Sequence, residues 1–194
     1  MDINCLLFDD FETMDLFGPV EVFGKIEEYQ IKYFSIEGKV VTSRQNARIL
    51  TENINDMTSN SIMVIPGGKG TRDLVNNSGF IQKLKDAAEK SSWCLSICTG
   101  SALLAKAGLI DGLEATSNKI AFEWVRTNGK HVKWVYKARW ATDGKYYTSS
   151  GVSAGIDMSL GFVADRFGEK RAQDIAKMIE YQWNCDKHDD IFAL

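Results

Sequence analysis

The sequence is poor in histidine and proline, with two of each among 194 residues. It also lacks an apolar run long enough to span a membrane and any block of basic residues. The net charge is −3, which argues against a protein that binds nucleic acid through phosphate contacts. The N-terminus shows neither a positively charged region nor a cleavage site. We therefore expect a cytoplasmic protein that contacts neither membranes nor nucleic acid.

Several common binding motifs are missing too. The four cysteines, Cys5, Cys94, Cys98 and Cys185, show no paired metal-ligand spacing, so we expect free thiols and no metal site. The glycine-rich segment 66–70 does not continue as a dinucleotide fingerprint, and no P-loop is present. With 44% hydrophobic residues, however, the chain can bury a substantial core.

The order of the elements is set by short apolar runs that alternate with amphipathic segments. Runs at 3–8, 30–36, 61–65 and 92–97 predict buried strands, and segments at 19–24, 79–91, 119–127, 151–167 and 169–181 predict helices. Residues 131–141 and 145–149 predict a peripheral β-hairpin around an Asp-Gly turn. This alternation predicts an α/β, flavodoxin-like three-layer sandwich with a mostly parallel sheet covered by helices on both faces. We expect one domain over residues 1–183, followed by a loose acidic tail at 184–194.

The segment around Cys98 carries the clearest chemical signal. The apolar run 92–97 is followed by Cys98, Thr99 and Gly100, and then by a helix-forming run. A strand that turns sharply into a helix exposes the corner residue at the carboxyl edge of the sheet, as in a nucleophile elbow. A thiol at that corner faces the positive end of the helix dipole, so we expect it to ionise more readily than a free thiol. Cys5 and Cys94 lie within apolar strands and are interpreted as packing residues.

A cysteine nucleophile often has a histidine base, but neither histidine is suitably placed. His131 begins a peripheral strand and His188 lies in the acidic tail, so both are interpreted as surface residues. A carboxylate can take that role, and Asp15, which precedes Pro19, is the best candidate, although a helix cap is an equally good explanation. Glu12 and Glu21 are rivals. Burial beside a thiolate would raise the pKa of the carboxyl group and keep it protonated.

Backbone N–H groups in two loops could stabilise negative charge on a substrate. The loop at 66–70 exposes glycine amides, and the amide of Thr99 lies beside the predicted nucleophile. Ligands of parallel α/β sheets bind outside the carboxyl ends of the strands. The loops at 9–18, 66–70 and 98–101 are therefore expected to surround the site.

Five segments together resemble the ThiJ/PfpI superfamily, which has a class I glutamine-amidotransferase-like fold. They are Asp-Leu-Phe-Gly-Pro at 15–19, Ile-Pro-Gly-Gly at 65–68, Ile-Cys-Thr-Gly-Ser at 97–101, Ala-Gly-Leu-Ile-Asp-Gly at 107–112 and Gly-Val-Ser-Ala-Gly-Ile-Asp at 151–157. The first and third segments are most similar to the isocyanide hydratase branch. The resemblance spans nearly the whole chain.

This resemblance implies functional roles for particular residues. Cys98 would be the nucleophile, Asp15 the adjacent carboxylate, Thr99 a polar helper, and Gly68 a backbone donor. From the same matched segments we expect the substrate pocket to include Gly67, Gly151 and Ser153, and we expect Asn118 to form one wall of it. The resemblance also implies a homodimer with the site near the interface, a small-molecule substrate and no cofactor.

One position departs from the pattern. Related proteins tend to carry a histidine shortly after a Thr-Thr or Thr-Ser element, whereas Thr116 and Ser117 are followed here by Asn118. This change removes the base of an amidase or protease. The isocyanide hydratases tend to carry this histidine as well, so the change alters one wall of the expected site. The resemblance to that branch, with Cys98 and Asp15 as the matching pair, implies the leading hypothesis: a cysteine-dependent hydro-lyase that converts isocyanides to N-substituted formamides. The alternatives are a cofactor-free glyoxalase or deglycase, and a redox-sensing stress protein in which Cys98 is oxidised.

Overall fold

The computed structural model describes residues 1–193, and its centre is a seven-stranded sheet. In spatial order the strands are β10 (Trp140–Asp143), β11 (Tyr146–Ser149), β7 (Trp93–Ser96), β6 (Ile62–Ile65), β1 (Asp2–Leu6), β2 (Gln30–Ser35) and β5 (Glu52–Asn53). All neighbouring strands are parallel except β10 and β11, which form the antiparallel hairpin at one edge. The carboxyl ends of β1, β6 and β7 therefore lie together at one edge of the sheet.

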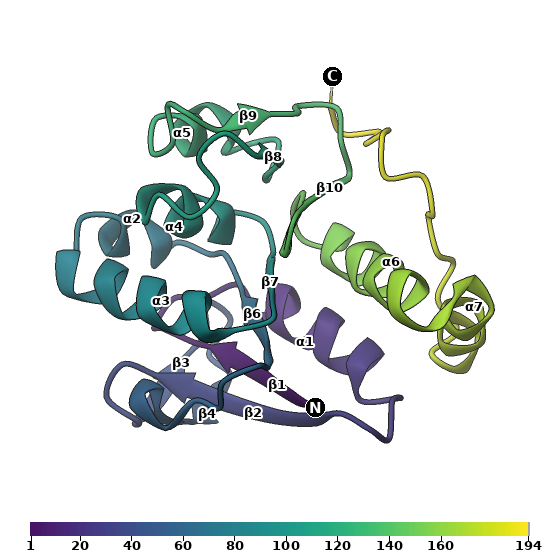
Figure 1. Ribbon diagram of the computed structural model, residues 1–194, viewed down its shortest axis with the longest axis horizontal. Coiled ribbons are helices and arrows are strands. Elements are labelled where there is room, and N and C mark those ends of the chain that lie inside the picture. The colour runs from purple at the N-terminus through teal and green to yellow at the C-terminus, as the bar shows by residue number, and fades with distance from the viewer. Residues whose placement is uncertain (194) are drawn as a thin grey trace.

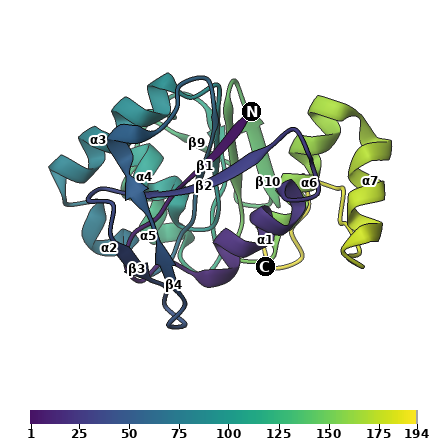
Figure 2. The ribbon, with the colours of Figure 1, turned by 90° about the horizontal axis from the view of Figure 1, so that it is seen from below.

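Helices cover both faces of this sheet (Figures 1 and 2). Helices α1 (Thr13–Phe23), α6 (Ala154–Phe167) and α7 (Glu169–Met178) lie on one side. The other side carries α2 (Thr71–Leu74), α3 (Ser78–Lys90), α4 (Gly100–Lys106) and α5 (Phe122–Arg126). The predicted α/β sandwich, with a mostly parallel sheet and a hairpin at its edge, is confirmed. Among the described residues, no helix is both long and apolar enough to cross a membrane.

Small elements complete the structure at the periphery. Strands β3 (Val40–Thr42) and β4 (Arg48–Leu50) form an antiparallel pair, and β8 (Glu114–Ala115) pairs in parallel with β9 (Lys133–Trp134). A 3-10 turn, η1, spans Ile54–Asp56. The expected strand at 131–141 is thus divided, because only its two ends pair with other strands.

The core is formed where the central strands meet the helices. All residues of β6 are buried, as are four of the five residues of β1. On one face of the sheet, Phe23 of α1 packs edge-to-face against Phe162 of α6 at a centroid distance of 6.0 Å. Burial of both strand faces explains why these strands are apolar throughout rather than alternating.

Four helix starts differ from those predicted, and α5 is one of them, because it begins at Phe122 rather than at residue 119. Helix α1 begins at Thr13, so Asp15 lies in its first turn, and Pro19 lies inside the helix instead of opening it. Helix α3 begins at Ser78, one residue before the predicted segment, and is capped by Asn77, whose side chain accepts a hydrogen bond from Phe80 N at 3.0 Å. Helix α6 begins at Ala154, because residues 151–153 form a turn that joins it to β11.

The tail at 184–193 is not loose, contrary to our expectation. Its backbone pairs with residues near β10: Arg139 N donates to Lys187 O at 2.9 Å, and Asp190 N donates to Lys137 O at 2.8 Å. The Asp190 side chain is buried between two cations, Lys119 at 3.8 Å and Arg139 at 3.6 Å. The acidic composition of the tail therefore includes one carboxylate that neutralises buried positive charge.

Candidate functional site

Cys98 occupies a strained turn between β7 and α4. Its φ angle is +55°, in the left-handed region that non-glycine residues rarely adopt. Two residues later, a Cβ atom at Gly100 would lie 2.6 Å from Ile65 O, so this position has no room for a side chain. The short Cys-Thr-Gly sequence therefore folds as the predicted strand-to-helix elbow. Backbone strain of this kind is typical of functional sites.

Hydrogen bonds from other segments hold the elbow in place. The Cys98 N–H donates at 3.2 Å to the carbonyl oxygen of Ser150, the residue that follows β11. The Cys98 carbonyl accepts hydrogen bonds from Ser117 Oγ at 2.8 Å and from Ser101 Oγ at 3.1 Å. The side chain of Cys98 is almost fully buried, and the residue is 7% exposed.

Asp15 lies beside Cys98, as predicted, and is completely buried. One carboxyl oxygen, Oδ2, accepts a hydrogen bond from Gly67 N at 2.9 Å. The other oxygen, Oδ1, is buried without a hydrogen-bond partner among the described residues. Within residues 1–193, no lysine, arginine or histidine forms an ion pair with Asp15. An isolated buried carboxylate is costly, so the protonated form is favoured.

The pKa values of the Asp15 carboxyl and the Cys98 thiol are both raised. Burial raises the pKa of Asp15 to about 8, against smaller lowering effects of the Gly67 N–H and a hydrogen bond with Cys98. Burial also raises the pKa of Cys98, and the negative charge of Asp15 raises it further. The N–H and hydroxyl of Thr99 oppose this shift. The expectation of an easily ionised thiol is therefore wrong, because desolvation outweighs the helix terminus.

The glycine loop after β6 connects these groups. Gly67 has no space for a side chain, since a Cβ there would lie 2.5 Å from Thr99 N and 2.9 Å from Asp15 Oδ2. Gly68, at φ +123°, donates its N–H to Thr99 Oγ1 at 3.0 Å. The predicted use of Gly68 as a donor to substrate therefore requires this bond to be exchanged, and that role stays a prediction. The loop at 66–70, Thr99 and Asp15 do lie together.

The remaining predicted pocket residues lie near the elbow on its other side. A Cβ atom at Gly151 would lie 2.0 Å from Asn118 Nδ2, so these two residues are in direct contact. Asn118 Oδ1 accepts a hydrogen bond from Ala121 N at 2.9 Å and so caps the turn before α5. Gly151 directly follows Ser150, the acceptor for the Cys98 N–H. Ser153 is exposed and its hydroxyl lies 3.5 Å from Arg139 Nη2, so its place in a pocket stays a prediction.

The other residues considered as partners of Cys98 lie in different environments. Glu12 accepts a hydrogen bond from Gln45 Nε2 at 2.6 Å, and Glu21 forms an exposed ion pair with Lys25 at 2.7 Å. His131 and His188 are both exposed. Asp15 is thus the carboxyl group that the fold brings to Cys98, and both histidines lie at the surface, as expected.

Sequence reasoning missed one charged residue of this region, Arg72 of α2. Its guanidinium carbon lies 3.5 Å from the centroid of the Trp124 ring, and burial lowers the pKa of the guanidinium. No sequence signal distinguishes Arg72 among the 23 lysines and arginines. The residue before it, Thr71, lies with its hydroxyl oxygen 3.1 Å from Thr99 Oγ1.

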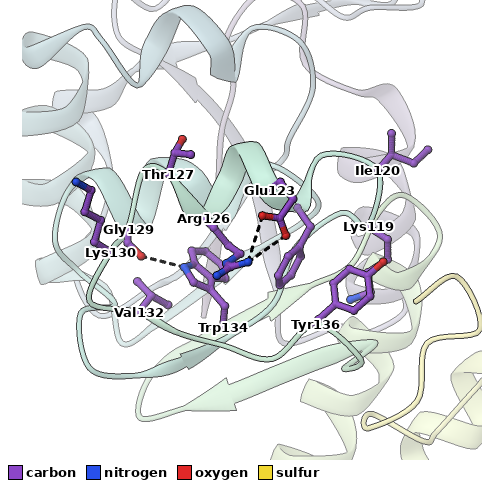
Figure 3. Close-up of a pocket in the computed structure, with 11 residues that line it drawn as sticks. Lys119, Ile120, Glu123, Arg126, Thr127, Gly129, Lys130, Val132, Trp134 and Tyr136 are labelled. Carbon is purple, nitrogen blue, oxygen red and sulfur yellow. Dashed lines mark hydrogen bonds and ion pairs between the residues drawn. The ribbon is translucent and has the colours of Figure 1, made fainter. Parts of the chain in front are cut away.

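A cavity of about 810 Å³ lies on the outer side of α5 (Figure 3). The aromatic side chain of Trp134 lies in it, with its indole N–H donating to Gly129 O at 2.9 Å, and Glu123 pairs with Arg126 at 3.1 Å. Neither Cys98 nor Asp15 lines this cavity. It is therefore separate from the candidate site.

The fold and the site define an α/β protein with a buried cysteine at a strand–helix elbow, next to a buried carboxyl group. Over residues 1–165 the sequence matches the DJ-1/PfpI family, and the chain belongs to this family. The resemblance inferred from the motifs is thereby confirmed at the level of the family.

Individual relatives differ in their described functions. An isonitrile hydratase from Pseudomonas putida is 28% identical over 182 residues, which are 93% of this chain and 78% of the relative. The HTH-type transcriptional regulator GbdR from Pseudomonas aeruginosa is 24% identical over 93% of this chain and 50% of the relative.

Solved structures share the fold. A ThiJ/PfpI family protein from Pseudomonas syringae superposes with a TM-score of 0.81 at 26% identity, covering 94% of this chain and 76% of that chain. Drosophila melanogaster DJ-1beta superposes with a TM-score of 0.79 at 20% identity, covering 94% and 98%. Activity and substrate must therefore be argued from the site.

Proposed function

We propose that the protein is a cysteine-dependent hydro-lyase that converts small isocyanides to N-substituted formamides. The observation that carries this proposal is the buried Asp15 carboxyl group beside Cys98, with no histidine nearby. The similarity to an isonitrile hydratase over 93% of the chain supports the same reaction. Addition of water to an isocyanide needs a nucleophile and a group that delivers and removes protons, and this pair can supply both.

In the first step, the Cys98 sulfur attacks the terminal carbon of the isocyanide. A carbon–sulfur bond forms, and the carbon takes up a proton from the protonated Asp15 carboxyl group, which gives a thioimidate. The thiol proton of Cys98 passes to the Asp15 carboxylate as its S–H bond breaks, so Asp15 is protonated again at the end of the step. The raised pKa of Asp15, about 8, keeps this proton available near neutral pH. The unpartnered Oδ1 atom is free to carry or receive it.

In the second step, water adds to the carbon–nitrogen double bond of the thioimidate. Asp15 gives its proton to the nitrogen and takes one proton from the water as the adduct forms. When the adduct collapses, the carbon–sulfur bond breaks, Asp15 returns its proton to the Cys98 sulfur and takes up the hydroxyl proton of the adduct, and the N-substituted formamide leaves. Cys98 and Asp15 return to their starting states, so the net reaction consumes one isocyanide and one water.

The test is turnover of aryl and alkyl isocyanides, followed as formamide produced. We expect Cys98→Ala to lose activity to background, whereas Cys185→Ser, at an exposed cysteine, retains it. Full activity in Cys98→Ala would overturn the mechanism, and no activity of the wild-type protein on any isocyanide would overturn the substrate class. A parallel assay with methylglyoxal separates this reaction from that of a glyoxalase.

A redox role for Cys98 is the second candidate. The protonated Asp15 carboxyl group beside the sulfur could donate a hydrogen bond to a cysteine sulfinate formed by peroxide. Mass spectrometry after mild peroxide treatment tests this role. A gain of two oxygens confined to Cys98, together with no isocyanide turnover, would favour it over the hydratase.

We further propose that two copies of the chain associate, as the family resemblance implies. Light scattering of the purified protein checks this proposal. A monomer mass at all concentrations would contradict it.

A further inference from the structure

Both backbone groups of Cys98 are bonded to residues of other segments. The Cys98 N–H donates to Ser150 O at 3.2 Å, and the Cys98 carbonyl accepts from Ser117 Oγ at 2.8 Å. Ser150 follows β11, and Ser117 lies two residues after β8. A non-glycine residue at φ +55° keeps that conformation only when its surroundings fix it. What holds the two serines therefore also holds the strained cysteine.

Lys119 holds the segment that carries Ser117. Its ammonium nitrogen, Nζ, donates to Ala138 O at 2.6 Å, to Thr116 Oγ1 at 3.0 Å and to Ser117 O at 3.4 Å. An ammonium group has three N–H donors, and these three oxygens use all of them. The Lys119 side chain is only 5% exposed, so its charge lies inside the protein and needs a buried counter-charge.

Arg139 holds Ser150, on the other side of Cys98. The Ser150 N–H donates to Arg139 O at 2.8 Å. The guanidinium of Arg139 is buried and forms an ion pair with Asp157 of α6. The two chains of hydrogen bonds that begin at Cys98 therefore end at two residues with buried cations, Lys119 and Arg139.

One carboxylate, that of Asp190 in the C-terminal segment, faces both cations. Its Oδ2 lies 3.8 Å from Lys119 Nζ, and its Oδ1 lies 3.6 Å from Arg139 Nη1. The Asp190 side chain is completely buried, and its segment runs from α7 back past β10, where Asp190 N donates to Lys137 O (Figure 1). Burial lowers the pKa of Lys119 to about 8, the charge of Asp190 opposes this effect, and the charge of Arg139 adds to it. Asp190 therefore helps to keep Lys119 protonated, with all three donors present.

We propose that Asp190 is a positioning residue for Cys98, on which it acts through the two cations Lys119 and Arg139. The C-terminal segment thereby fixes both backbone hydrogen bonds that Cys98 makes with other segments, and with them the direction of its side chain. Asp190 needs no contact with a substrate in this scheme. The role rests on the proposed function only in taking Cys98 as the reactive group. It also explains why an acidic tail places one carboxylate in the interior.

Hydrogen exchange of single amides, followed by NMR on the full-length protein, tests this role. Asp190→Asn keeps the size of the side chain and an oxygen that can accept from Phe192 N, which lies 3.1 Å from Asp190 Oδ1, but it removes the charge. We expect the amides of Cys98 and Ser150 to exchange at least about tenfold faster than in wild type. Asp190→Glu restores the charge, so its exchange rates should fall between those of wild type and Asp190→Asn.

Matched controls separate this local effect from a general loss of stability. Asp189→Asn removes an exposed carboxylate of the same segment and should leave both amides unchanged. Phe34→Ala creates a cavity in β2, which β1 and β6 separate from β7, and so destabilises the fold without touching the bonds to Cys98. Its Cys98 and Ser150 amides should exchange as in wild type, because their local opening does not depend on global unfolding.

A charge-balanced variant covers the case in which Asp190→Asn does not fold. Lys119→Met combined with Asp190→Asn removes one buried charge of each sign and leaves the pair of Arg139 and Asp157. It should still speed exchange at Cys98, because Ser117 has lost its link to Lys119.

Turnover supplies the second measurement. Asp190→Asn should lower kcat for an isocyanide about tenfold, because the sulfur is no longer held in its direction of attack. Asp190→Glu should recover part of this loss, whereas Phe34→Ala should retain kcat at temperatures at which it is folded.

Unchanged exchange at Cys98 and Ser150 in folded Asp190→Asn would overturn the proposal, as would equal acceleration in Asp189→Asn or Phe34→Ala. The exchange measurement uses no isocyanide. A wild-type protein without hydratase activity would therefore leave the Asp190 proposal intact, and unchanged exchange would leave the hydratase proposal intact.

Discussion

Two fully buried carboxyl groups in this protein, Asp15 and Asp157, have opposite surroundings. Asp157 accepts hydrogen bonds from Arg139 Nε at 2.6 Å and from Asn184 N at 3.0 Å, and it forms an ion pair with Arg139. Asp15 accepts one backbone hydrogen bond, from Gly67, and has no ion-pair partner among the described residues. Burial raises the pKa of both groups, but only at Asp157 does an arginine oppose that effect.

The difference indicates what each carboxyl group does. The Asp157 cluster, in which Asp157 and Asp190 face the two cations Arg139 and Lys119, is neutralised and joins the C-terminal segment to α6 and β10. Asp15 is left unpaired beside a strained cysteine, and unpaired burial of a titratable group is typical of a reactive site. A carboxyl group paired with a cation serves the fold, whereas one paired with a thiol can exchange a proton.

The largest expected effect is on the pH dependence of stability in Asp15→Asn. The pKa of Asp15 in the folded protein, about 8, lies above its ordinary value of 3.8. Between these values the unfolded chain releases a proton that the native protein keeps, so the free energy of unfolding falls as pH rises. The Asp15→Asn variant has no carboxyl group to titrate at this position, so its free energy of unfolding does not fall in this way. The difference in free energy of unfolding between this variant and wild type should grow in favour of the variant from pH 4 to pH 8, by on the order of 5 kcal/mol at most.

Urea denaturation of both proteins across this pH range measures the difference. Glu21→Gln, at an exposed position on the same helix, is the matched control and should follow wild type. A constant difference between Asp15→Asn and wild type at every pH would mean that Asp15 is already ionised throughout, and the comparison with Asp157 would fail.

The next effect in size is the loss of the paired cluster in Arg139→Met. This change leaves Asp157 and Asp190 buried without their shared cation, which should lower the free energy of unfolding by about 3–5 kcal/mol at neutral pH. Arg126→Met, at an exposed ion pair, should cost no more than about 1 kcal/mol. Urea denaturation measures both variants. Similar losses would show that the buried cluster contributes no more to the free energy of unfolding than an exposed ion pair does.

The smallest effect concerns the wall of the Cys98 site in Gly151→Ala. The new Cβ atom would overlap Asn118 Nδ2, so Asn118 has to move, at a cost of about 1–3 kcal/mol. Gly79→Ala, where the nearest atom lies 3.5 Å from the added Cβ, is the control and should be near neutral. Thermal melting measures both. Equal melting temperatures for the two variants would indicate that Asn118 and Gly151 form a flexible wall.

Local sequence patterns determined most of the fold. Buried strands such as Ile62–Ile65 are apolar on both faces, so they can be recognised in the sequence without knowing which elements pack against them. Element starts were less predictable: Pro19 suggested the beginning of a helix, but α1 begins six residues earlier, at Thr13. Packing of α1 against the sheet outweighs the missing N–H of one proline. The tail was also misjudged, since its composition is acidic and only the buried Arg139 and Lys119 explain its position.

The sequence by itself determined the elbow at Cys98, because a strand, a cysteine, a small residue and a helix are adjacent along the chain. It also pointed to Asp15, whose proximity follows from the order of parallel strands. Only the tertiary structure decided the protonation of these groups. The pKa values depend on how completely the fold excludes water and on which charges lie nearby. Burial and distant charges are properties of the assembled fold, so no local pattern records them.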